Sequence, residues 1–305
     1  MDSCSLRACI RRSACISTQR PLIKRNITMA PAPPSQDDLE GYWGPPTSTL
    51  DWCEENYVTS YYIAEWWNTL SNLFMIVLPI ISSVYMWKEN VEMRYIWANL
   101  SLLVVGIGSW CFHMTLLYGM QLLDELPMVW GSIVMIYISF ESCEKPGNLN
   151  TKLLTALFIY CLLITIIYLT AVNPLIHQVG YGFLVVLLVG RGIYMLRYYG
   201  RHKNKFLYAY CLGLYAFAFF LWNIDNNLCT SVRSLRKSLP FPLSAVTQLH
   251  GWWHIMAGTS THCFVILMCN FRSNYLRREN KLEYTAGLIP FVRHPVKGYE
   301  MNHNM

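Results

Sequence analysis

Residues 248–254 read Gln-Leu-His-Gly-Trp-Trp-His, and apolar residues follow as far as Met268. An α-helix has ~3.6 residues per turn, so His250 and His254 lie one turn apart on the same helical face. This spacing suits two imidazole groups that share one metal ion. The same spacing also occurs in helices that bind no metal. The pair therefore predicts a metal site only if the rest of the chain supplies a third ligand and an acid or base.

The composition is that of a membrane protein. Only 14% of the 305 residues are charged, against roughly 25% in soluble domains, and 54% are hydrophobic. The 11 Trp and 20 Tyr residues suit the aromatic belts that lie at membrane surfaces. The formal charge of +6 does not indicate nucleic-acid binding, because the basic residues are divided between the two ends and short loops. The 11 Cys residues are scattered, often within apolar runs, and do not form a disulfide framework.

Seven apolar stretches from Trp66 onward approach the ~20 residues that cross a bilayer. Lipid offers no hydrogen-bond partners, so each stretch is expected to be a helix that pairs its own backbone groups. The predicted fold class is an all-α membrane protein, a seven-transmembrane helix bundle with an intramembrane metal site. The stretches are residues 66–87, 95–117, 122–140, 152–172, 177–197, 206–224 and 243–270.

Basic residues in the loops set the expected orientation, because Lys and Arg are enriched on the cytosolic side. The loops after the first, third and fifth stretches and the C-terminal tail are rich in Lys and Arg, whereas the opposite loops hold only Arg233, Arg236 and Lys237. The basic N-terminal segment lies far from the first stretch and counts weakly. We therefore expect a multi-pass protein with the N-terminus outside or lumenal and the C-terminus cytosolic.

Four domains are expected along the chain. Residues 1–40 form a basic and then proline-rich tail, expected to be disordered; a transit-type segment is the alternative, and Met29 could itself begin a protein. Residues 41–65 form an acidic loop, residues 66–270 the transmembrane domain, and residues 271–305 a cytosolic tail.

Polar side chains of several stretches fall at the same lumenal level. Ser109 and His113 lie towards the outer end of the second stretch, and Asp124 begins the third. His250 and His254 lie in the outer half of the seventh. Ionisable groups within a membrane are costly and face a bundle interior or a wet cavity. The alternative to a metal site is a polar network that ties these helices together.

Three imidazole nitrogens and a water molecule would form the open site of a catalytic zinc ion. Zinc lowers the pKa of bound water towards ~7 and polarises a carbonyl group, and amide hydrolysis needs both effects. Asp124 is suited to accept the proton of the water, and Ser109 to donate a hydrogen bond to the developing oxyanion. The stretch 248–254 has no acid between its histidines, so the base has to come from another helix.

A second polar cluster precedes the first stretch: Asp51-Trp52-Cys53-Glu54-Glu55-Asn56, followed by Glu65. Clustered acidic oxygens suit calcium, which takes 6–8 oxygen ligands, although the order of residues is not that of an EF-hand. Acidic residues before a helix also stabilise its N-terminus, so a capping role is equally open.

Cys53 and Cys229 both fall on the outer side of the membrane. In an oxidising compartment they could join the N-terminal loop to the loop after the sixth stretch, and two free thiols are the alternative.

Several motifs resemble those of the alkaline ceramidase family, in the same order and over roughly residues 41–290. The motifs are Gly41-Tyr-Trp-Gly-Pro-Pro-Thr-Ser-Thr-Leu-Asp-Trp-Cys-Glu-Glu-Asn56, Gly108-Ser-Trp-Cys-Phe-His-Met-Thr115, Gln121-Leu-Leu-Asp-Glu-Leu-Pro-Met128, Trp222-Asn-Ile-Asp-Asn226 and His250-Gly-Trp-Trp-His254.

The resemblance implies a zinc-dependent amidohydrolase. It would cleave the N-acyl bond of ceramide, phytoceramide or dihydroceramide, taken as lipid substrates from the membrane, to give a sphingoid base and a fatty acid. Residues 66–270 would then be the hydrolase domain, located in the endoplasmic reticulum and Golgi apparatus. Protein partners are not indicated.

The resemblance also implies site residues. His113, His250 and His254 would bind Zn²⁺, with Ser109 and Asp124 acting beside it. Tyr181 and Trp253 match positions near the substrate amide, although packing is their ordinary role. The Ca²⁺ ligands, with a structural or regulatory role, would be Asp51, Trp52 (through its carbonyl), Glu54, Asn56 and Glu65.

Two other functions fit part of the pattern. A receptor of the adiponectin/progestin-receptor type shares the zinc-histidine geometry, but the acidic loop argues against it. A transporter or G-protein-coupled receptor accounts for seven stretches but not for the meeting of His113, Asp124, His250 and His254 at one level.

Overall fold

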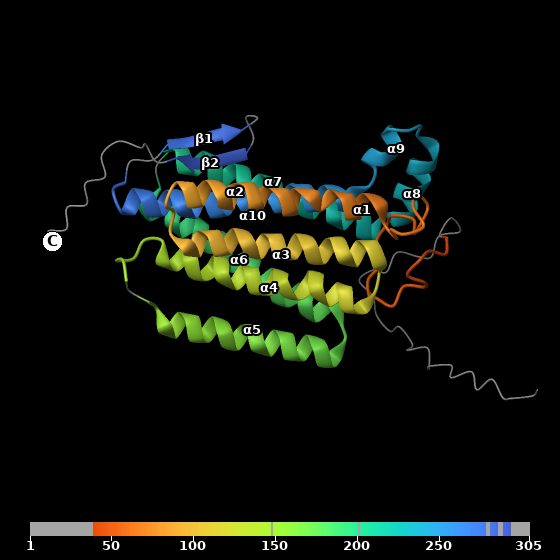
Figure 1. Ribbon diagram of the computed structural model, residues 1–305, viewed down its shortest axis with the longest axis horizontal. Helices are drawn as coiled ribbons and strands as arrows, with labels where there is room; N and C mark the ends of the chain where they lie inside the picture. The colour runs from red at the N-terminus through yellow and green to blue at the C-terminus, as the bar shows by residue number, and fades with distance from the viewer. Residues whose placement is uncertain (1–38, 148, 201, 279–280, 286–288, 294–305) are drawn as a thin grey trace, which may run out of the picture.

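The computed structural model describes residues 39–147, 149–200, 202–278, 281–285 and 289–293. Long helices lie side by side and form the body of the protein (Figure 1). The elements are α1 (Trp66–Ser71), α2 (Leu73–Lys88), α3 (Met93–Thr115), α4 (Tyr118–Glu141), α5 (Thr151–Ala171), α6 (Pro174–Tyr199), α7 (His202–Asn227), α8 (Cys229–Ser238), α9 (Leu243–Val246), α10 (Leu249–Tyr275), β1 (Lys281–Thr285) and β2 (Ile289–Arg293).

In the described part of the chain, six helical segments are long and apolar enough to span a membrane. The first combines α1 and α2, and the others lie in α3, α4, α5, α6 and α7. Their apolar side chains remain widely exposed on the outside of the bundle, for example Phe158 on α5 and Val186 on α6. Such surfaces are stable only against lipid, so the protein is an all-α membrane protein.

Helix α10 is as long as these helices but less apolar, because it carries three histidines and Asn270. It contacts α1, α2, α3, α4 and α7, and most of its residues are buried. Cys263 and Val265–Cys269 form the centre of the largest apolar core together with residues of α3 and α7. Protein rather than lipid therefore surrounds α10, and this explains how it can hold polar residues at membrane depth.

Helices α3 and α4 approach closely at Gly108. A Cβ atom at this position would lie 1.9 Å from the backbone oxygen of Leu123. The missing side chain lets the two backbones touch, as small residues do between helices in membranes. This contact places Ser109 of α3 next to Asp124 of α4.

Two boundaries differ from those expected. The stretch 243–270 is divided into α9 and α10, and α10 continues past 270 to Tyr275. The segment expected to be a tail contains an antiparallel hairpin of β1 and β2, which packs on α10, with Pro290 O lying 3.3 Å from Nε2 of His262. The hairpin lies at the end of the bundle opposite α8 and α9 (Figure 1). Most of the expected N-terminal tail, residues 1–38, lies outside the described residues.

We expect Gly108→Ala to destabilise the protein by ~2 kcal/mol, because the added methyl group would force α3 and α4 apart. The measurement is thermal unfolding of the purified protein in detergent, followed by tryptophan fluorescence. Gly190→Ala on α6 is the matched control, since a Cβ atom there would meet nothing within 4 Å. Equal melting temperatures for Gly108→Ala and the control would contradict the close contact.

Candidate metal centre

Three histidines from two helices meet at one point. His113 comes from the last turn of α3, and His250 and His254 come from the first turns of α10. One ring nitrogen of each lies within 4.8 Å of those of the others, and all three side chains are buried. The predicted third histidine is therefore brought to the pair, and the group could hold a metal ion.

The surrounding contacts orient the rings. Nδ1 of His113 lies 2.5 Å from Oε2 of Glu65, and Nδ1 of His254 lies 2.8 Å from the hydroxyl of Ser71. The ring of His250 stacks on Trp52 at 3.8 Å. Metal-bound histidines usually use their second ring nitrogen in this way, on a carboxylate or another polar group.

Two ring nitrogens point to a missing partner. Nε2 of His113 and Nδ1 of His250 are buried, and neither has a hydrogen-bond partner among the described residues. Leaving a buried polar atom unpaired costs about 1–3 kcal/mol. A metal ion would supply both nitrogens with a partner, so the residues fit a bound metal.

Ser109 and Asp124 lie in the same place. The hydroxyl of Ser109 is within hydrogen-bonding reach of the Asp124 carboxylate, and both side chains line a cavity together with His250 and His254. Asp124, which belongs to a third helix, thus lines the same cavity as two of the three histidines.

The cavity beside the histidines has a volume of about 540 Å³ and a mainly apolar lining from α2, α3, α4, α6, α7 and α10. Tyr181 and Trp253 both lie on its wall. Their rings contact Tyr215, whose hydroxyl is 3.0 Å from that of Tyr181 and whose ring packs edge-on against Trp253. The cavity is of the size of ligand pockets and suits a molecule with apolar chains.

The acidic residues of the N-terminal loop surround the start of α1. The Glu54 carboxylate accepts hydrogen bonds from the backbone N–H groups of Trp67 and Asn68, at 2.7 and 2.9 Å. It therefore takes the capping role that was one of the two alternatives. Oδ1 of Asp51 accepts a hydrogen bond from the Asn56 amide at 3.5 Å.

Glu65 connects this loop to the histidines. One carboxylate oxygen accepts the Trp52 N–H at 3.2 Å, and the other faces His113. Within the described residues, no group of three carboxylates is as closely gathered as the three histidines. The predicted calcium ligands thus lie in one region, the N-terminal loop and the start of α1.

Burial raises the pKa of both Glu54 and Glu65 to about 8. The negative charge of Glu65 adds to this effect at Glu54. Ionising two buried carboxyl groups is costly, and a bound cation would offset this cost. Glu54 and Glu65 are therefore favourable partners for a cation.

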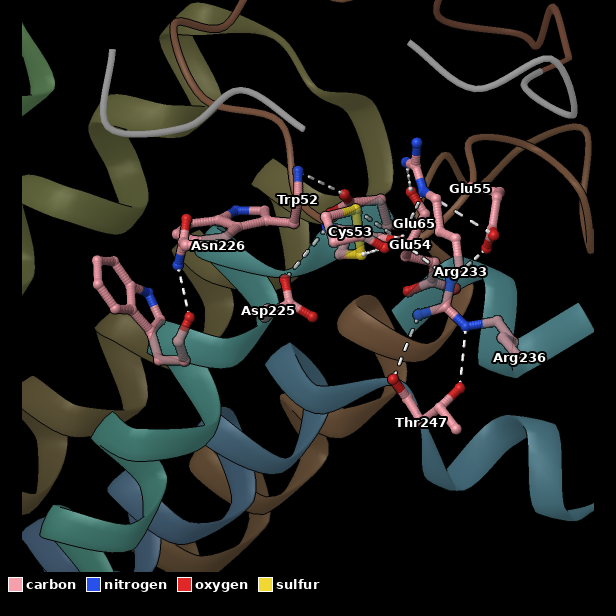
Figure 2. The surroundings of a disulfide bond; sticks show 12 residues. Trp52, Cys53, Glu54, Glu55, Glu65, Asp225, Asn226, Arg233, Arg236 and Thr247 are labelled. Atoms are coloured by element: carbon pink, nitrogen blue, oxygen red, sulfur yellow. Dashed lines mark hydrogen bonds and ion pairs between the residues drawn. A yellow bond between two sulfur atoms is a disulfide. The ribbon is translucent and has the colours of Figure 1, made fainter. Parts of the chain in front are cut away.

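A disulfide bond joins Cys53 to Cys229, with the two Cα atoms 5.3 Å apart (Figure 2). It connects the N-terminal loop to α8. Around it, Arg233 and Arg236 donate hydrogen bonds to the carbonyl of Cys53, and Asp225 accepts the Cys53 N–H at 3.2 Å.

The sequence analysis does not predict the roles of three residues in this region, Arg233, Arg236 and Ser71. The sequence predicts Arg233 and Arg236 only as charges of a loop, although on the amphipathic helix α8 their spacing places them on one face. No sequence pattern indicates that Ser71 contacts His254.

Glu65→Gln is expected to weaken metal binding about 10- to 100-fold, because it removes the carboxylate that orients His113. Competition with a chelator measures the affinity. Glu55→Gln is the control, since Glu55 pairs with Arg233 and Arg236 and not with a histidine. Wild-type affinity in Glu65→Gln would show that this contact does not support the site.

The chain matches the family model described as Ceramidase over residues 44–293. It is 46% identical over 264 residues to alkaline ceramidase 3 of Mus musculus, covering 87% of this chain and 97% of the relative. Alkaline ceramidase YPC1 of Saccharomyces cerevisiae is 34% identical over 255 residues, covering 78% and 80%. Because the match extends over most of this chain and nearly all of the mouse relative, the chain belongs to the ceramidase family, among the alkaline ceramidases.

Proposed function

We propose that this ceramidase is an intramembrane zinc amidase that cleaves the N-acyl bond of ceramide, phytoceramide or dihydroceramide to a sphingoid base and a free fatty acid. The observation that carries the proposal is the buried group of His113, His250 and His254, two of which, His250 and His254, line an apolar cavity. The names of the relatives support the reaction, and the unpaired nitrogens of His113 and His250 support the metal.

Zinc is the proposed metal because three imidazole nitrogens with one open position are typical of catalytic zinc sites. When bound, it would lower the pKa of a water molecule and polarise the amide carbonyl. His113, His250 and His254 would hold it, with Glu65 and Ser71 fixing the orientation of two of the rings.

Asp124 is the proposed general base. It lines the same cavity as His250 and His254, and its carboxylate would accept a proton from the attacking water and later pass it to the leaving amine. Ser109 would keep this carboxylate in place and donate a hydrogen bond to the oxygen of the scissile amide as charge develops there. Tyr181 and Trp253, which also line the cavity, would position the amide.

We further propose that α10 is the seventh transmembrane helix. It is long enough at 27 residues, and its neighbours α2, α3 and α7 are themselves spans. The histidines would then lie near the lumenal surface, at the end that carries the Cys53–Cys229 disulfide. Disulfides form in oxidising compartments, in keeping with the endoplasmic reticulum and Golgi apparatus and with a cytosolic C-terminus.

Calcium is proposed to bind the N-terminal loop through Asp51, the Trp52 carbonyl, Glu54, Asn56 and Glu65. The raised pKa values of Glu54 and Glu65 support a cation there. Because Glu65 also contacts His113, calcium would act by fixing the loop and α1 against the metal centre.

His254→Ala should lower both the zinc content and the hydrolysis of ceramide in detergent micelles by more than about 100-fold, because two histidines hold zinc weakly. Metal content is measured by mass spectrometry of the purified protein, and turnover by release of the fatty acid. His202→Ala, at an exposed position at the start of α7, is the control. Full hydrolysis by metal-free His254→Ala would overturn the zinc mechanism.

Without calcium, the stability of the protein is expected to fall as the pH rises from about 6 to about 8. The Glu54 and Glu65 carboxyls have pKa values of about 8 when folded and 4.5 in the reference state, so the folded state holds more protons in this window and higher pH favours unfolding. Calcium needs the ionised carboxylates, so its stabilising effect should grow over the same window.

Melting temperatures measured across this pH range, with calcium and with a chelator, test this expectation. Glu54→Gln should flatten both dependences, and Glu40→Gln in the exposed part of the loop should leave them unchanged. A calcium effect that shrinks with rising pH would contradict calcium binding by these carboxylates.

A further inference from the structure

A second polar cluster lies at the cavity and shares no residue with the group of histidines that would bind zinc. It consists of Gln121 and Glu125 of α4, Tyr168 of α5 and His177 of α6, and all four side chains are buried. Glu125 and His177 line the cavity, whose surface is otherwise mainly apolar. The mechanism above uses none of these residues.

One oxygen of Glu125 is held firmly by its neighbours. Oε2 accepts hydrogen bonds from the Tyr168 hydroxyl and, at 2.9 Å, from Nε2 of Gln121. Gln121 is itself fixed by the N-terminal loop, because its Oε1 accepts the backbone N–H of Thr49 at 2.8 Å. Oε1 of Glu125 is left to face His177, with 3.3 Å between it and Nδ1.

His177 lacks the partners that a buried histidine needs. Its exposed fraction is 4%, and neither ring nitrogen has a hydrogen bond to any described residue. The ring lies parallel to that of Tyr181 at 5.9 Å, while Nε2 remains unpaired and Nδ1 faces only Oε1 of Glu125. Buried polar groups without partners are uncommon and call for an explanation.

The carboxylate decides what the ring can offer to a ligand. Because Oε1 of Glu125 faces Nδ1, the tautomer with its proton on Nδ1 lets these two atoms pair and leaves Nε2 as an acceptor. The cavity therefore presents, from α4 and α6, a hydrogen-bond acceptor and a carboxylate oxygen, both suited to a donor such as a hydroxyl group.

We propose that Glu125 and His177 form a subsite that binds a hydroxyl group of the sphingoid base. Ceramide has hydroxyls on the two carbons that flank the amide-bearing carbon, and with its amide at the histidines these are the remaining polar groups that enter an apolar cavity. This subsite rests on the proposed function, because it requires the amide to lie at the metal centre. It would orient the scissile bond and select lipids with a hydroxyl at that carbon.

The test compares ceramide with 1-deoxyceramide, which lacks the primary hydroxyl, and 3-deoxyceramide, which lacks the secondary one. The wild-type protein is expected to hydrolyse one of the analogues with a kcat/KM about tenfold below that of ceramide, the usual effect of one hydrogen bond. His177→Phe keeps an aromatic ring at this position and removes both ring nitrogens. This variant should lower the kcat/KM for ceramide by about the same factor and leave the kcat/KM for that analogue unchanged. His177→Gln should restore part of the preference for ceramide.

Tyr160→Phe is the matched control. It removes a hydrogen bond of 2.8 Å between the Tyr160 hydroxyl and the Gly180 carbonyl, which also joins α5 to α6, but Tyr160 does not line the cavity. The preference between ceramide and its analogues should persist in this variant. Equal slowing of all three substrates by His177→Phe would assign His177 a structural role and overturn the subsite, and so would a wild-type protein that shows no preference.

A binding measurement separates this inference from the catalytic proposal. In Asp124→Asn protein, the rise in melting temperature caused by ceramide should exceed that caused by the same deoxy analogue, and His177→Phe should abolish the difference. If the wild-type protein does not hydrolyse ceramide but ceramide still raises its melting temperature more than the deoxy analogue does, the amidase mechanism is refuted and the subsite is supported. Equal shifts for all three lipids would refute the subsite whatever the turnover.

Discussion

The contact between Glu65 and His113 is the interaction on which the rest of the structure depends. Glu65 begins α1 and also accepts the Trp52 N–H, so a single carboxylate joins the N-terminal loop, the first helix and the end of α3. Backbone bonds reinforce it, because Ala64 and Glu65 donate to the carbonyls of Met114 and His113 at 2.9 and 3.0 Å. A change in the loop is therefore transmitted to a ring of the candidate metal centre.

The membrane imposes the second constraint. Lipid cannot pair polar groups, so histidines, carboxylates and amides at membrane depth have to face other helices or the cavity. Helix α10, enclosed by its neighbours, holds two of the metal-centre histidines, and α4 supplies Asp124 and Glu125 to the same cavity. Helix α5, the least buried of the spans, contributes Tyr168 only from the end next to the N-terminal loop.

The N-terminal loop is the part that links the two polar clusters of the cavity. Through Glu65 it reaches His113, and through Thr49 and Gln121 it reaches Glu125. The disulfide and the two arginines of α8 fasten the same loop from outside. A short loop without regular secondary structure is thus fixed at several points, and this allows buried carboxylates to be placed with precision.

The sequence by itself determined that the chain is a bundle of membrane helices, that His250 and His254 share a face, and which residues resemble a ceramidase site. The first two features follow from composition and local periodicity, which a linear chain displays directly, and the third rests on motifs that resemble those of the family. The tertiary structure alone decided that Glu65 contacts His113 and that His177 is buried beside Glu125. It also decided that α10 extends past 270 under a hairpin. These depend on how closely helices approach, as at Gly108, and on contacts between residues far apart in the chain, which leave no pattern in a single sequence.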